Sequence, residues 1–282
     1  MEIKTLGKII NGQDGAIFGG YLFRLSEKGN CTAYNIKDLS GNPSPLAEFN
    51  LDKRDLIVPH CNSVCFGNEY YDKNDEFPLL YANIYNNYAS KENKLKGVTC
   101  VYRLERKEND FTTTLVQIIE VGFTEDSIWK SEDINDKRPY GNSAVDSDSS
   151  TFYAFTMRDG EKNTRYFAFD LPKLCDGVFD DKYGVNRVVL KKKDIQHYFD
   201  CEYHNFMQGA CIHKGVLYSV EGFTHFESAP PVIRLIDLKE RKQKSAFNFE
   251  DFGLYIEPEL VDFDGDTCYY SDDVGNMYTL SF

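Results

Sequence analysis

The patterns that would assign a function directly are missing from this 282-residue chain. The phosphate-binding pattern G-x-x-x-x-G-K-[ST], the dinucleotide pattern G-x-G-x-x-G and the nucleophile pattern G-x-S-x-G are all absent. No CxxC pair occurs among the eight cysteines, whereas zinc sites need a tighter cluster of ligands. No apolar run approaches the length that crosses a membrane. The sequence therefore predicts no cofactor and no metal site.

Positive charge is also scarce. The chain has 32 Lys and Arg residues against 45 Asp and Glu residues, a formal net charge of −13. Nucleic acids and anionic membranes both need cationic contacts, so we expect neither as a partner. A neutral sugar, a cation or a basic protein is compatible with this composition. The alternative is that the charge only keeps the protein in solution.

The cysteines and the start of the chain bear on the compartment. The cysteines are spread out and mostly lie in apolar strand contexts, which predicts free, buried thiols in a reducing environment. The first residues lack the basic, apolar and small-residue pattern of a secretory signal. We therefore expect a cytoplasmic protein, or a secreted one if a signal peptide precedes the sequence given.

What the chain does contain is a recurring strand-turn-strand unit. Gly15–Phe23 aligns with Gly209–Tyr218, and Ser143–Tyr153 aligns with Glu259–Tyr270. Each reads as a small or polar entry, an apolar strand, a tight turn and an aromatic strand. Aromatic residues make up 15% of the chain, mostly Tyr and Phe, which favours strands. A unit that recurs at this spacing predicts a repeat architecture.

The repeats divide the chain into five units, at about residues 13–52, 60–121, 140–193, 207–249 and 257–282. Four units contain four expected strands, and the third takes Arg187–Lys191 as its outer strand. The last unit has only three, so the alternating segment 1–10 is expected to complete it, which closes a ring and removes exposed sheet edges. This pattern resembles the five-bladed β-propeller superfamily, an all-β fold, and we expect one domain. A sixth blade is the alternative if residues 122–139 or 171–205 contain further strands.

A site is expected on the face of the ring where the long loops gather. Each unit places polar residues just before its inner strand, and these entries would converge at the mouth of the central channel. Asp14, Glu257 and Glu259 supply carboxylates there. The other residues expected to bind a ligand are Gln13, His60, Asn62, Asn142 and Gln208 at the mouth, with Trp129, Tyr140 and His204 as its wall.

Two interpretations of this polar ring compete. In the structural one, the side chains bond to backbone groups and water around a wet axle, and His60 is a hydrogen-bonding spacer. In the functional one, they form a site for a small ligand. The leading hypothesis is a non-catalytic propeller that binds a small polar ligand, for example a carbohydrate, or a protein. A pure protein-interaction scaffold that uses the flat face of the ring is a further alternative.

The chain is similar in one respect to arabinanase-type glycoside hydrolases, which carry acids on inner strands around the axle of a five-bladed propeller. The resemblance implies that Asp14 and Glu257 or Glu259 could be the catalytic carboxylates of a carbohydrate-active hydrolase or lyase. Those enzymes need a third acid on a middle blade, where this chain has only amides, which cannot transfer protons. Whether the protein is an enzyme therefore stays open. The stretch Pro59–Gly67, followed by Asp75–Tyr81, looks like a motif of uncharacterised bacterial propeller proteins.

Overall fold

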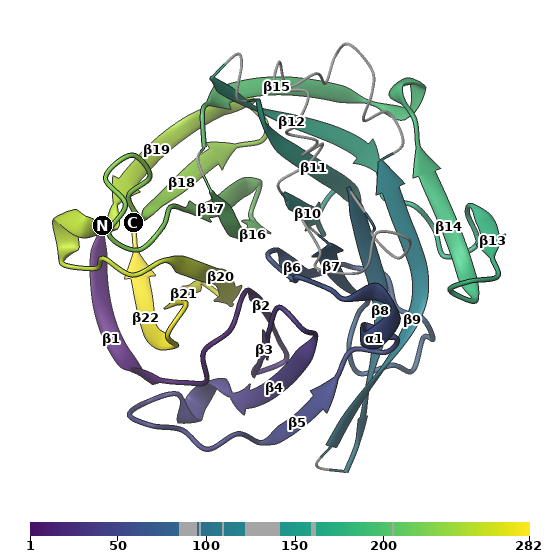
Figure 1. Ribbon diagram of the computed structural model, residues 1–282, viewed down its shortest axis with the longest axis horizontal. Helices are drawn as coiled ribbons and strands as arrows, with labels where there is room; N and C mark the ends of the chain where they lie inside the picture. Colours follow the sequence, from purple (N-terminus) through teal and green to yellow (C-terminus); the bar gives the residue numbers. More distant parts are fainter. Residues whose placement is uncertain (85–94, 96, 109, 122–141, 159–161, 205) are drawn as a thin grey trace.

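Strands dominate this chain because aromatic and β-branched residues alternate with polar ones between turns rich in Gly, Asn and Asp. A computed structural model arranges them in five sheets around a central axis, as the blades of a β-propeller (Figure 1). The predicted all-β, five-bladed fold is confirmed. The structure describes residues 1–84, 95, 97–108, 110–121, 142–158, 162–204 and 206–282. In this part of the chain, no helix has the length and apolar character needed to span a membrane.

Blades one, four and five each contain four antiparallel strands. In blades one and four the strands follow one another in chain order from the axis outward. Blade one contains β2 (Gly15–Phe18), β3 (Tyr21–Leu25), β4 (Asn30–Asn35) and β5 (Ala47–Asn50). Blade four contains β16 (Met207–His213), β17 (Val216–Glu221), β18 (Val232–Asp237) and β19 (Lys242–Asn248). Blade five contains β20 (Pro258–Asp264), β21 (Thr267–Asp272), β22 (Asn276–Ser281) and, from the other end of the chain, β1 (Glu2–Lys8).

Closure of the ring follows the sequence prediction. Strand β1 is antiparallel to β22, from Glu2 opposite Ser281 to Lys8 opposite Asn276. The end of β1 is also held by blade one, since the Lys8 amide donates to the carbonyl of Gly41 at 2.7 Å. The first and last segments of the chain therefore lie side by side (Figure 1).

Blades two and three differ from the expected partition. Blade two contains β6 (Val64–Phe66), β7 (Leu80–Ile84), β8 (Val98–Lys107), β9 (Asp110–Val121), β14 (Val185–Leu190) and β13 (Val178–Asp180). Blade three contains β10 (Asn142–Asp146), β11 (Thr151–Arg158), β12 (Asn163–Asp170) and β15 (His197–Glu202). The prediction that Arg187–Lys191 is the outer strand of blade three was wrong, because this segment runs parallel to β9. The third unit consequently extends past residue 193.

Cross-strand contacts explain why β14 joins blade two and β15 joins blade three. On β14, the Arg187 guanidinium pairs with Glu120 of β9 at 2.7 Å. On β15, Phe199 stacks on Tyr166 of β12 with ring centroids 5.1 Å apart, and Asp200 pairs with Arg165 at 2.6 Å. Both segments have the period of a strand, so only these long-range contacts decide which blade each one joins.

Within the described residues, the core consists of five apolar clusters, one between each pair of neighbouring blades. Alternating side chains of a strand point to opposite faces, so each blade contributes to two clusters. Between blades one and two, for example, Phe23, Phe66, Phe77 and Phe111 pack with ring centroids 5.2 to 6.4 Å apart. The helical elements are short: α1 (Arg54–Ile57), η1 (Ile36–Asp38), η2 (Lys192–Asp194) and η3 (Phe249–Phe252).

The expectation for the cysteines holds in most positions. All eight are free, Cys201 is partly buried and Cys175 is exposed. The buried ones are Cys31, Cys61, Cys65, Cys100, Cys211 and Cys268.

Candidate functional site

The polar residues that precede the inner strands do meet around the axis. Asn62 of blade two donates from Nδ2 to Oδ1 of Asn142 in blade three at 2.7 Å, and Asn142 donates in turn to the carbonyl of Gln208 in blade four. Asn62 and Asn142 have no exposed surface. Their amides therefore join neighbouring blades, as the structural interpretation of the ring predicts.

The chain of contacts continues to two glutamates of blade five. Gln208 donates from Nε2 to Oε1 of Glu257, and Gln13 of blade one donates from Nε2 to Oε1 of Glu259 at 3.2 Å. We use the name axial acid site for these four residues, Gln13, Gln208, Glu257 and Glu259. Because the carboxylates lie on blade five and the amides on blades four and one, three blades must be assembled to form the site.

The two glutamates differ in exposure. Glu257 is half-buried, and burial raises its pKa to about 7, with a further contribution from the negative charge of Asp273. Glu259 is 1% exposed. Burial raises its pKa well above the ordinary value, the charge of Glu257 adds to this, and the charge of Arg24 opposes it. Glu257, whose pKa is about 7, can therefore hold and release a proton near neutral pH, with Glu259 as a neighbouring carboxyl group.

Asp14 lies deeper, at the axis itself. Its Oδ2 accepts a hydrogen bond from the Val64 amide of β6 at 2.7 Å. A Cβ atom on Gly209 of β16 would lie 2.7 Å from Asp14 Oδ1 and 2.1 Å from the backbone oxygen of Glu259, so only glycine fits there. Asp14 has no exposed surface, and burial raises its pKa well above the ordinary value, although hydrogen bonds from Val64 and Gly15 oppose this. The carboxyl group thus bonds blade one to blade two through Val64 and lies against Gly209 of blade four.

Arg24 lies in this region, although the sequence analysis did not identify it as a site residue. It is 1% exposed and donates from Nη2 to the carbonyls of Gly12 at 2.6 Å and Asp272 at 3.0 Å. Burial lowers its pKa, while the charges of Glu259 and Asp14 raise it. The available signal was a charged residue inside the apolar run Tyr21–Leu25, but position alone does not reveal that its partners lie on blade five.

An open pocket of about 410 Å³ lies over blade one beside the axial acid site. Gln13 links the two, since it lines the pocket and also donates to Glu259. The lining residues are Ile10, Asn11, Gln13, Arg24, Leu25, Ser26, Glu27, Lys28, Asn30, Thr32 and Asp273.

The other predicted site residues are distributed differently. His60 is half-buried, and burial lowers its pKa while the charge of Glu27 opposes the shift. His204 is fully buried between blades three and four, where Nδ1 lies 3.1 Å from the Tyr166 hydroxyl and 3.7 Å from Glu221 Oε2. Its contacts are therefore with these blades and not with the axial acid site. Trp129 and Tyr140 lie outside the described residues.

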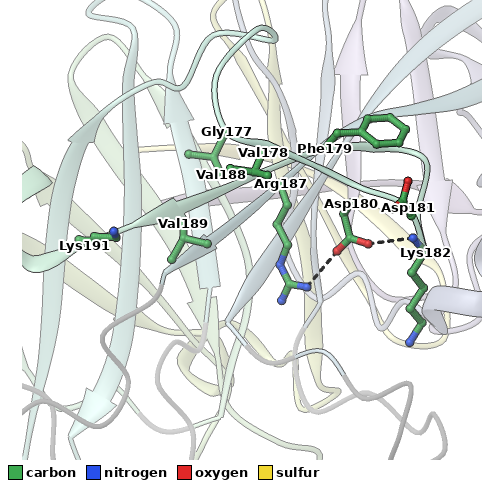
Figure 2. A pocket seen from close by; sticks show the side chains of 10 residues that line it. All are labelled: Gly177, Val178, Phe179, Asp180, Asp181, Lys182, Arg187, Val188, Val189 and Lys191. Carbon is green, nitrogen blue, oxygen red and sulfur yellow. Dashed lines mark hydrogen bonds and ion pairs between the residues drawn. The ribbon is translucent and has the colours of Figure 1, made fainter.

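A second pocket, of about 920 Å³, lies on the outside of blade two against β13 and β14 (Figure 2). Val178 and Phe179 are 77% and 60% exposed there. In this pocket Arg187 pairs with Asp180 at 3.3 Å (Figure 2). The axial acid site is the stronger candidate because it combines buried carboxyl groups with a pocket.

Replacing Glu257 with glutamine is expected to remove a pH-dependent loss of stability. Because the pKa of Glu257 is raised from 4.5 to about 7, the folded protein retains a proton that the unfolded chain has released. The wild type should therefore lose stability as the pH rises from about 4.5 to about 7. With a discount for the exposed part of the side chain, the variant should gain about 1–2 kcal/mol relative to the wild type between pH 4.5 and pH 8.

Urea unfolding at the two pH values measures this difference. The exposed Glu2 provides the matched control, and Glu2→Gln should show no such change. A stability difference for Glu257→Gln that is the same at both pH values would contradict a raised pKa in the folded protein.

Comparison with known proteins supports the assignment of the fold but does not identify an activity. No protein-family model matches the chain, and no curated protein matches it. Among solved structures, Myxococcus xanthus glutaminyl cyclase aligns over 99% of this chain and 98% of its own, with a TM-score of 0.52 and 6% identity. The Myceliophteria thermophila Cps50 (Swd1) β-propeller domain aligns over 96% of this chain and 83% of its own, with a TM-score of 0.40 and 7% identity.

The similarity to the glutaminyl cyclase supports a shared fold only. At 6% identity, a common architecture does not carry an activity from one protein to another. No family match supports the resemblance to arabinanase-type glycoside hydrolases. Function therefore has to be argued from the residues of the axial acid site.

Proposed function

We propose that this protein binds a small polar ligand at the axial acid site. The observation that carries the proposal is the state of Glu259. Its side chain is 1% exposed, and among the described residues Oε2 has no hydrogen-bond partner. Leaving a buried polar atom without a partner costs about 1–3 kcal/mol, and such atoms in native structures call for an explanation. A ligand that donates to Glu259 would satisfy this oxygen.

The rest of the site fits this role. Glu257 is partly exposed and Gln13 lines the adjacent pocket, so a ligand could reach both residues from outside. Asn62, Asn142 and Asp14 are enclosed and bonded between blades, which makes them the scaffold of the site. The binding surface we propose thus contains fewer residues than the ring of strand entries that the sequence predicts.

A thermal-shift screen of oligosaccharides, amines, amino acids, nucleotides and organic acids tests the proposal. A ligand that binds only the native state raises Tm by mass action, by an amount equivalent to about 2.7 kcal/mol at a concentration one hundred times Kd. We expect at least one stabilising compound whose effect is lost in Glu257→Gln and Gln208→Ala but kept in Glu2→Gln. A panel without any stabiliser, or a stabiliser unaffected by the first two variants, would refute it. A panel without any stabiliser would favour a protein-interaction scaffold.

A second candidate is an enzyme that uses the same carboxyl groups. The observation in its favour is the raised pKa of Glu257, about 7, beside Glu259. General acids and bases work best when their pKa lies near the working pH, and paired carboxylates serve in glycoside hydrolysis. Of the three carboxyl groups only Glu257 is partly exposed, so it is the candidate acid or base, with Glu259 as its buried neighbour.

Two substrate classes should be tested for turnover: arabino-oligosaccharides and other glycosides, and peptides that begin with glutamine. The second class is suggested only by the name of the glutaminyl cyclase that shares the fold. For an enzyme, Glu257→Gln should abolish turnover while binding is nearly kept. Binding without turnover in the wild type would leave the non-catalytic proposal standing alone.

A further inference from the structure

Exposed aromatic side chains lie next to the axial acid site. The loop between β17 and β18 contacts Glu257 directly, because the Glu257 amide donates to Oγ1 of Thr224 at 2.9 Å. Two phenylalanines of the same loop, Phe223 and Phe226, are each 45% exposed. Both pack on Phe206, with ring centroids 5.7 and 5.9 Å apart. We use the name aromatic loop for residues 222–231, which carry these side chains.

A second aromatic contact lies on the segment that leads into Glu257. Tyr255, two residues before Glu257, is 45% exposed and stacks with His225 of the aromatic loop, with centroids 6.1 Å apart and planes inclined by 18°. Large aromatic side chains that remain partly exposed in a group are typical of binding surfaces. The group is joined to Glu257 by the hydrogen bond from its backbone amide to Thr224, and Tyr255 precedes it by two residues.

The backbone of this region is strained. Phe206 and His225 adopt left-handed conformations, with φ of 55° and 51°. Such angles are uncommon for bulky residues, and strain of this kind tends to be kept at functional sites. Gly222, which opens the aromatic loop, has φ of 109°, and a Cβ atom there would lie 2.2 Å from the carbonyl oxygen of Pro230. The loop is therefore folded tightly into its position beside Glu257.

Negative charge predominates in the sequence around Glu257 and the aromatic loop. After Lys244 the chain contains nine Asp and Glu residues and no Lys or Arg, and the aromatic loop has no Lys or Arg either. Arg24 is the buried cation nearby, and it lies among Asp14, Glu259, Asp272 and Asp273. In the described part of the chain, no three His, Cys, Asp or Glu side chains are placed to hold a metal ion. The site thus suits an organic cation better than an ion that needs several converging ligands.

We infer that the axial acid site takes an organic monocation, a protonated amine or a quaternary ammonium group, whose apolar part packs on the aromatic loop. This rests on the proposed function and names the ligand class for it. The cationic group would lie against Glu257, and in the case of a protonated amine an N–H could also donate to Oε2 of Glu259, which has no partner among the described residues. Aromatic faces attract cations through the negative potential of the ring, and a neighbouring carboxylate adds to this.

The test uses 2-phenylethylamine and its N,N,N-trimethyl derivative as probes in isothermal titration calorimetry with the full chain. The neutral 2-phenylethanol and the anionic phenylacetate are matched in size and lack the positive charge. We expect the cations to bind and the two controls to bind at least about tenfold more weakly, since a hydrogen bond or contact with a charged group contributes about 1.5–3 kcal/mol, a factor of roughly 10 or more. Glu257→Gln should weaken the cations by a similar factor.

Matched variants separate local effects from general ones. Phe223→Leu should weaken the cations several-fold, whereas Phe179→Leu on β13 and Glu2→Gln on β1 should leave the affinity unchanged. Failure of both cations to bind, or binding that Glu257→Gln leaves unchanged, overturns the inference. If a neutral or anionic compound from the wider panel binds instead and depends on Glu257, the proposed function stands and only the cation class is wrong. If nothing in that panel binds, both fail.

Discussion

Removing Glu2–Lys8 is expected to lower Tm by about 10 °C or more and to make the protein aggregate. Six residues of β1 pair with β22, and each backbone hydrogen bond contributes about 0.5–1.5 kcal/mol. A loss of several kcal/mol corresponds to about 2–4 °C per kcal/mol in a chain of this size class. The deletion also leaves β22 as an unpaired edge, which invites pairing with a second molecule.

Strand complementation provides the control for this experiment. A synthetic peptide of residues 1–10, added to the truncated protein, should restore Tm and suppress aggregation because it can replace the missing strand. A scrambled peptide of the same composition should not. A truncated protein that keeps the wild-type Tm and stays monomeric would show that pairing of the two chain ends does not hold the ring closed.

The sequence predicted the number of blades and most strands because each unit carries its own local signal. Alternation with period two and tight turns with Gly or Asp are properties of a few neighbouring residues, so they can be recognised without knowing the fold. The last unit, residues 257–282, for example, contains the three strands expected from the pattern. The pairing of β14 with β9 could not be recognised in this way, because it depends on contacts such as Arg187 with Glu120, 67 residues apart.

The candidate site could likewise be predicted only in part from the sequence. The convergence of the strand entries follows from the symmetry of a propeller, and the contacts of Gln13 with Glu259 and of Asn62 with Asn142 confirm that these entries meet. Which of them face a ligand remains a prediction. Arg24 and the phenylalanines of the aromatic loop were not among the predicted site residues, because their importance depends on neighbours distant in the sequence, as Thr224 contacts Glu257 33 residues away. Local residue types do not encode such distances.

Replacing Arg24 with leucine is expected to lower the free energy of unfolding by about 3–5 kcal/mol at pH 8. Removing one partner of a buried ionic group costs this much because the remaining charges are left without compensation. The guanidinium is 1% exposed and is the opposing charge to Asp14 and Glu259. It also joins the Gly12 segment to blade five through its bond to the Asp272 carbonyl. By contrast, Arg106→Leu removes an exposed pair with Glu76 and should cost at most about 1 kcal/mol.

The pH dependence distinguishes loss of charge from loss of packing. The pKa values of Asp14 and Glu259 are already raised by burial, and removing the nearby cation would raise them further, so both should take up protons more readily in the variant. The destabilisation should therefore be smaller at pH 5 than at pH 8 in urea unfolding. Glu259→Gln in the Arg24→Leu background should recover part of the loss at pH 8, because it removes one uncompensated carboxylate. The alternative result is an equal loss of stability at both pH values with no recovery in the double variant. It would mean that Arg24 stabilises the fold through its packing and its bonds to Gly12 and Asp272. The carboxyl groups of the axial acid site would then not need Arg24 as a counter-ion.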